Sequence, residues 1–232
     1  MKSILIILAS LCCHNLYCQG ISSILDKSTN PGEVLVEFDN RWADIKGSYY
    51  LLKDWQIGDM VLNSGISVRD QWINYDFEYD NLEVKLENHI KVIPLWSIDN
   101  FIVKPHVDDT RLFQPCYDYL LENSIPLAGV CEVLDSNYFG LIIKYTSDIK
   151  EATYVPALDM GKKEDEIIVK KKYYLTFGNS AIEIPKKEKC FYDLYAPYKD
   201  SLNYFVKEKK LNFKNKEDLK MILNYLNASK RH

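Results

Sequence analysis

The sequence contains none of the short motifs that mark common catalytic or cofactor sites. GxSxG, HExxH, a glycine-rich phosphate loop, the calcium-loop spacing and a CxxC pair are all missing from its 232 residues. The mature chain has no apolar run of about 20 residues, which a helix needs to span a bilayer. Glycoside hydrolysis is not excluded. It needs a pair of carboxylates, and the sequence around the 33 acidic residues does not show which two could form such a pair.

Basic residues are not in excess. The chain contains 29 Lys and Arg and 33 Asp and Glu, which give a net charge of −4. An acidic chain is not expected to bind nucleic acid. The balance is uneven, because residues 19–185 hold 16 basic and 27 acidic residues, whereas residues 186–232 hold 12 and 6. We interpret the basic tail as a solvated helical face; the alternative is docking on an anionic surface.

Cysteine is scarce after the first 20 residues, where only Cys116, Cys131 and Cys190 remain. In an oxidising compartment Cys116 and Cys131 are the economical disulfide pair, because they lie on neighbouring predicted strands. Buried free thiols fit the spacing equally well. None of the three lies near a histidine, so we expect no metal site and no cofactor.

The first residues have the order of a secretory signal peptide: one basic residue, Lys2, then an apolar stretch over residues 4–11, then small and polar residues. We predict a signal peptide over residues 1–18 with cleavage after Cys18, and therefore an exported protein, periplasmic or extracellular. No cysteine of this leader follows the small residues that a lipid anchor needs. The alternative is a buried N-terminal strand.

The β signal is clearest over residues 59–103. Apolar residues alternate on both sides of residues 63–65, which suit a three-residue hairpin turn with glycine in the left-handed position. This pattern places Leu62 opposite Ile66 and Met60 opposite Val68. All four side chains are then expected on one buried face.

A second hairpin is predicted around a two-residue turn at Asp80 and Asn81. Its predicted apolar pairs are Tyr79–Leu82, Phe77–Val84 and Tyr75–Leu86. A third strand over residues 90–94 keeps Ile90 and Val92 on the apolar face if residues 87–89 form a three-residue connection.

Further short strands are predicted at residues 117–121, 128–134, 139–145, 167–177 and 181–184. Helical spacing begins after Pro197 and again after a predicted cap at Asn215, which indicates two short amphipathic helices. We therefore predict a mainly β (α+β) protein: an antiparallel meander, sandwich or partly open barrel over residues 19–185. The helical pair in residues 186–232 is expected to pack on the sheet.

The best polar constellation is HVDD at residues 106–109. An extended backbone here would aim His106 and Asp108 the same way, within reach of one metal ion or one proton. Two such groups do not complete a site, and a solvated loop explains them more simply. They are weak catalytic candidates, for a hydrolase that would need an unidentified partner residue.

Aromatic residues are abundant, with 17 Tyr, 9 Phe and 4 Trp making 13% of the chain. Several concentrate in the first half: Trp42, Tyr49, Tyr50, Trp55, Trp72 and Trp96. Burial on a pleated sheet is the main expectation for them. The alternative is an exposed platform that binds sugars or peptides.

Three segments carry a resemblance: residues 47–85, which begin GSYYLLKDW, IDNFIV at residues 98–103, and residues 200–227, which begin DSLNYFVKEKK. In layout and hydrophobic pattern they look like a widespread group of uncharacterised exported proteins of Gram-negative bacteria. The likeness covers most of the mature chain. It implies a β-rich exported protein ending in short helices, and no activity or site residue.

The expected function is that of an exported, non-enzymatic interaction or structural protein of the bacterial periplasm or envelope. Its partner would be an unknown protein or envelope component. The alternative is a small-ligand or glycan-binding module that uses aromatic residues, and a structure with exposed, clustered Trp and Tyr rings would favour that alternative.

Overall fold

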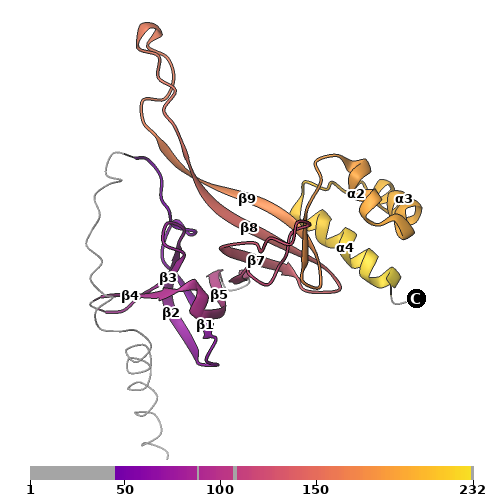
Figure 1. Ribbon diagram of the computed structural model, residues 1–232, viewed down its shortest axis with the longest axis horizontal. Helices are drawn as coiled ribbons and strands as arrows, with labels where there is room; N and C mark the ends of the chain where they lie inside the picture. Colours follow the sequence, from indigo (N-terminus) through magenta and orange to yellow (C-terminus); the bar gives the residue numbers. More distant parts are fainter. Residues whose placement is uncertain (1–44, 88, 107–108, 231–232) are drawn as a thin grey trace, which may run out of the picture.

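The protein is one open, antiparallel ten-stranded sheet followed by three helices (Figure 1). The computed structural model describes residues 45–87, 89–106 and 109–230. Strands make up 45% of it and helices 23%, which confirms the predicted mainly β class with C-terminal helices. The sheet does not close into a barrel. The predicted signal peptide lies outside the described residues.

The strands follow the chain as β1 (Gln56–Leu62), β2 (Ser67–Asp76), β3 (Asn81–Lys85), β4 (Ile90–Pro94), β5 (Ile98–His106), β6 (Asp109–Pro115), β7 (Val130–Asp135), β8 (Phe139–Lys150), β9 (Glu166–Phe177) and β10 (Ser180–Glu183). Their order in the sheet is β10-β9-β8-β7-β6-β5-β1-β2-β3-β4. Consecutive strands pair with each other, except that β5 pairs with β1 instead of β4. Figure 1 shows the long β8–β9 hairpin projecting beyond the rest of the sheet.

The first five strands must curl. In the sheet order β4 and β5 are four strand spacings apart, which is about 19 Å in a flat sheet. Only the 3-10 helix η2 (Leu95–Ser97) joins them, and a link of this length spans at most about 14 Å. Strands β1–β5 therefore form a rolled half of the sheet with an inner face and an outer face.

The first predicted hairpin is confirmed. Met60 pairs with Val68, and the Leu62 N–H donates to the Ile66 carbonyl at 2.9 Å. Gly65 has a φ of 81°, the left-handed conformation expected at the end of the turn. Met60, Leu62 and Val68 are buried together.

The predicted register of the second hairpin is wrong. Tyr75 pairs with Leu82 rather than Leu86, so the turn holds four residues, 77–80, instead of two. Side chains set this wider turn: Asp76 Oδ1 accepts the Glu78 N–H at 2.7 Å, and the Tyr75 hydroxyl donates to Asp80 at 2.5 Å. The register moves by an even number of residues, so Tyr75 and Leu82 still lie on the buried face.

The predicted connection before β4 is also wrong. The Leu86 N–H donates to the His89 carbonyl at 2.9 Å, so the chain reverses over two residues rather than three. A change of one residue turns the strand over. As a result Lys91 and Ile93 are buried, whereas Ile90 is 42% exposed.

A column of aromatic rings crosses the inner face of the sheet. Tyr75, Phe101, Phe113 and Tyr145 follow one another with centroid separations of 6.3, 5.0 and 6.1 Å. All four are buried. Tyr75 reaches Phe101 although β1 lies between their strands, which agrees with the curl of the rolled half.

Three helices, not the predicted two, pack on the other end of the sheet: α2 (Glu188–Leu194), α3 (Lys199–Lys209) and α4 (Lys216–Lys230). Seven residues make α2 too short to show a helical period in the sequence. The predicted cap of α4 is confirmed, because Asn215 Oδ1 accepts the N–H of Glu217 at 2.8 Å and of Asp218 at 3.2 Å. The helices share a core with β8 and β9 that includes Phe139.

Candidate functional site

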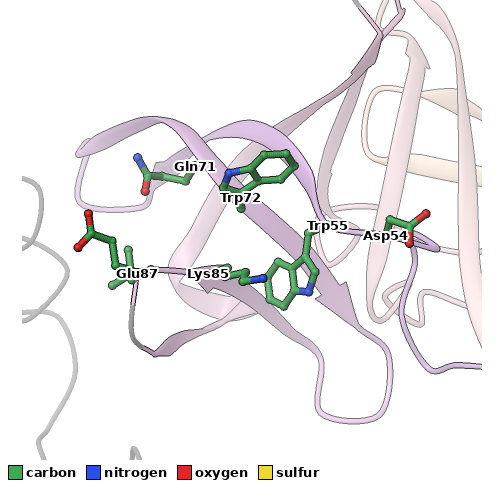
Figure 2. Close-up of a pocket in the computed structure, with 7 residues that line it drawn as sticks. Asp54, Trp55, Gln71, Trp72, Lys85 and Glu87 are labelled. Carbon is green, nitrogen blue, oxygen red and sulfur yellow. The ribbon is translucent and has the colours of Figure 1, made fainter.

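A recess of about 680 Å³ lies on the outer face of the rolled half (Figure 2). Seven residues line it: Asp54, Trp55, Gln71, Trp72, Lys85, Leu86 and Glu87. We call it the tryptophan groove. Its volume is within the range of ligand sites, about 300–1,000 Å³.

Strand alternation places two of these side chains. Trp72 on β2 lies directly opposite Lys85 on β3. Their neighbours Ile73 and Val84 form the next pair of the ladder, and both are fully buried in the core. Because successive side chains of a strand point to opposite faces, Trp72 and Lys85 point outward.

Trp72 and Lys85 belong to a row of four outward side chains that crosses β1 to β4. Ile57 pairs with Trp72, and Lys85 pairs with Ile90. The exposed fractions are 38% for Ile57, 50% for Trp72 and 42% for Ile90. Apolar side chains therefore flank Lys85 along this row, and of these three only Trp72 lines the groove.

The segment before β1 positions the second indole. The Trp55 ring contacts the Tyr50 ring at a centroid distance of 6.5 Å, and the Tyr50 hydroxyl donates to Glu83 Oε2 at 2.9 Å. Burial raises the pKa of the Tyr50 hydroxyl and the Glu83 charge acts in the same direction, so the hydroxyl keeps its proton and remains a donor. This contact fixes Trp55 beside the β2–β3 hairpin.

The charged groups of the groove have no partners among the residues that the structure describes. Asp54, Lys85 and Glu87 make no hydrogen bond or ion pair there. Several other surface lysines do form ion pairs, as Lys104 does with Asp59 at 2.7 Å. Figure 2 shows the Lys85 side chain extending in the direction of the Trp55 ring, with Glu87 at the other side of the groove.

A buried ionic cluster lies on the inner face of the sheet. Arg111 donates two hydrogen bonds to Glu132, at 3.2 and 2.9 Å, and the Tyr145 hydroxyl donates to the same carboxylate. Lys216 of α4 lies 3.5 Å from it. Burial by itself raises the pKa of the Glu132 carboxyl, but the bonds from Arg111 and Tyr145 outweigh it and hold the pKa below its usual value. The cluster joins β6, β7, β8 and α4, so we assign it a structural role.

The sequence candidates His106 and Asp108 are not brought into a described site. His106 is exposed at the end of β5 and pairs with Asp109 at the start of β6. Asp108 lies outside the described residues, and in the described ranges no group of three His, Cys, Asp or Glu residues is placed to hold a metal ion.

Cys116 and Cys131 form a disulfide, with their Cα atoms 5.6 Å apart and a sequence separation of 15. Both are fully buried, and 14 residues lie between them in sequence; Cys190 is free and exposed on α2. The bond links the end of β6 to β7, whose strands already pair. The sequence left two alternatives open, a disulfide and a pair of buried free thiols, and the structure has the disulfide.

Replacing both disulfide cysteines with alanine is expected to lower the free energy of unfolding by about 3 kcal/mol, the chain-entropy value for a loop of this length. Urea unfolding of the oxidised wild type and of the double variant measures the difference. A reducing agent should destabilise the wild type and leave the double variant unchanged. Cys190→Ala serves as the control and should behave like the wild type; equal stability of all three proteins would contradict the prediction.

Sequence reasoning singled out Trp55 and Trp72 only as part of the aromatic concentration, and it did not select the other lining residues. One signal was present: Ile73 and Tyr75 belong to the buried face, so Trp72 falls at an outward position, where a polar residue is usual. The approach of Trp55 to that position depends on the segment over residues 49–52, which follows no periodic pattern.

No known protein family, curated protein or solved structure matches this chain. None of the described helices is long and apolar enough to cross a membrane. The residues of the tryptophan groove must therefore be interpreted from their own chemistry.

Proposed function

We propose that this is an exported, non-enzymatic interaction protein of the bacterial periplasm or envelope, and that it binds its partner at the tryptophan groove. The observation that carries the proposal is the exposed indole of Trp72 beside Asp54, Lys85 and Glu87, which have no partner among the residues that the structure describes. Large aromatic side chains at the centre of a contact are typical anchors of binding surfaces. The groove supplies such an anchor on a rigid hairpin.

Two observations support export. The first residues have the order of a signal peptide. The disulfide between Cys116 and Cys131 is of a kind that persists in oxidising compartments and is rare in the cytosol. Both fit a chain that works in the periplasm or outside the cell.

The groove is suited to holding a ligand. Its lining offers apolar surface from Trp55 and Trp72, an ammonium from Lys85, and carboxylates from Asp54 and Glu87. Activation of a nucleophile needs an acceptor in hydrogen-bond contact with it. The groove offers separate contact groups instead, which favours binding over catalysis.

The test is cell fractionation combined with cross-linking through a photoreactive residue at Gln71. Wild-type protein should appear in the periplasm without its leader and should cross-link to a specific partner. Trp72→Ala should weaken capture at least about 30-fold, the loss of a 2 kcal/mol anchor. Trp96→Ala removes another exposed indole, 73% exposed and outside the groove, and should have no effect. Retention in the cytoplasm, or equal capture by both variants, would refute the proposal.

A further inference from the structure

The exposed indole of Trp72 is a preformed flat platform. It lies on β2 between two paired strands, and its backbone is fixed by the ladders to β1 and β3. Half of the side chain is open to solvent, and so is much of Ile57 beside it. Little conformational entropy is lost when a flat apolar ligand covers such a surface.

A second platform lies in the same groove. Trp55 also lines it, but its ring contact is with Tyr50 rather than with Trp72. The two indoles therefore do not cover each other. Each offers a face to a ligand, which favours a chain of at least two flat units over one compact molecule.

The polar groups around the platforms can both donate and accept. Lys85 donates and the carboxylates of Asp54 and Glu87 accept, all without partners among the described residues. A sugar ring needs this combination. Its C–H face is weakly positive and stacks on the negative face of an indole, while its hydroxyl rim both donates and accepts hydrogen bonds.

Charge argues against an anionic ligand. The lining has two carboxylates against one ammonium and contains no arginine, the residue that recognises carboxylate and phosphate in a bidentate manner. A polyanion would bring its charges close to Asp54 and Glu87, with only Lys85 to compensate them. An uncharged, hydroxyl-rich chain avoids this cost.

We propose that the ligand of the tryptophan groove is an uncharged oligosaccharide of two or more units, with sugar rings stacked on Trp55 and Trp72. This inference rests on the proposed function and names the chemistry of its partner. Asp54 and Glu87 accept bonds from sugar hydroxyls, and Lys85 donates to a hydroxyl or ring oxygen. The site holds the chain and makes no covalent change to it.

The experiment is a calorimetric titration of the purified mature protein with cello- and chito-oligosaccharides of one to six units, followed in parallel by tryptophan fluorescence. At least one series should bind with a Kd between about 10 µM and 1 mM, more tightly as the chain lengthens from one unit to two or more. Binding should change little between low and high salt, because no ion pair is formed with the ligand.

Four variants locate the contact. Trp72→Ala and Trp55→Ala should each weaken binding at least about 10-fold, because each removes one of the two indoles on which a sugar ring would stack. Trp72→Phe should retain part of the affinity, and Trp96→Ala all of it. Thermal unfolding of each variant checks that the fold is retained, as expected for Trp72 on the surface.

The outcomes separate this inference from the proposed function. If none of these oligosaccharides binds while a protein partner is still captured in a Trp72-dependent manner, the oligosaccharide assignment is wrong and the proposed function stands. If the binding of these oligosaccharides weakens strongly as the salt concentration rises, charge rather than stacking holds the ligand, and the assignment is also wrong. If sugars bind equally well to Trp72→Ala, the groove is not their site, and the assignment fails again.

Discussion

Replacing Arg111 with methionine is expected to lower the free energy of unfolding by about 3–5 kcal/mol, because it leaves the Glu132 carboxylate buried without its ion-pair partner. The Glu132 side chain is 3% exposed and takes two hydrogen bonds from Arg111. Lys216, at 3.5 Å, is too distant and too exposed to replace them. Urea unfolding at neutral pH measures the loss.

The double variant Arg111→Met with Glu132→Leu is the matched control. It removes both charges, so no buried charge remains unpaired, and it should recover most of the lost stability. The Tyr145 hydroxyl then loses its acceptor, which leaves a deficit of about 1–3 kcal/mol. A double variant no more stable than Arg111→Met would show that packing of the arginine, rather than the ion pair, supports this region.

The same cluster predicts a pH dependence. Because the pKa of Glu132 lies below its usual value in the folded protein, its contribution to stability is present above the unfolded pKa, about 4.3, and is lost as the pH falls through the folded pKa. In Arg111→Met the largest influence that lowers this pKa is gone, so burial raises it against the remaining hydrogen bond from Tyr145. The stability difference between wild type and variant should therefore shrink between about pH 7 and pH 4. A constant difference would contradict the assignment.

Truncating Phe113 to alanine is expected to lower the free energy of unfolding by about 3–5 kcal/mol. The side chain is fully buried at the centre of the aromatic column, 5.0 Å from the Phe101 ring. The Arg111 guanidinium lies 4.9 Å from its centroid, so the cavity also removes the surface on which the arginine rests. Thermal and urea unfolding followed by circular dichroism give the size of the effect.

Two further variants test the cause. Phe113→Leu fills much of the cavity and should lose less than about half as much stability. Tyr204→Ala removes an aromatic ring that is 71% exposed on α3 and should change stability by less than about 0.5 kcal/mol. A loss for Tyr204→Ala as large as that for Phe113→Ala would argue against burial as the source of the effect.

The class of the fold could be predicted from local pattern, but its registers could not. The hairpin at Gly65 is specified by a short turn that only a few conformations satisfy, and its pairing was correct. The next turn is set by Asp80, whose carboxylate accepts from Tyr75 and whose carbonyl accepts from Leu95 of η2. The first contact spans five residues, and the second extends the β3–β4 ladder beyond the Asn81–Pro94 pair, so the turn depends on the pairing of a later strand as well as on its own residues.

The candidate site was still less predictable. Alternation does place Trp72 and Lys85 on the outer face once the register of β2 is known. Trp55 reaches the same place because Asn74, a buried side chain, bonds both the N–H and the carbonyl of Leu52 and so fixes the preceding segment. This contact joins parts of the chain that are 22 residues apart, and a periodic sequence pattern does not predict it.

The seam between β1 and β5 bears on how the chain assembles. Eight of the nine strand pairs join consecutive strands, and only this one brings together segments with three other strands between them. Neighbouring hairpins form quickly, whereas joining distant segments must first overcome loop-closure entropy. We expect the docking of β5 on β1 to be the slow step of folding. A mutation that weakens this seam should then slow refolding while leaving the early hairpins intact.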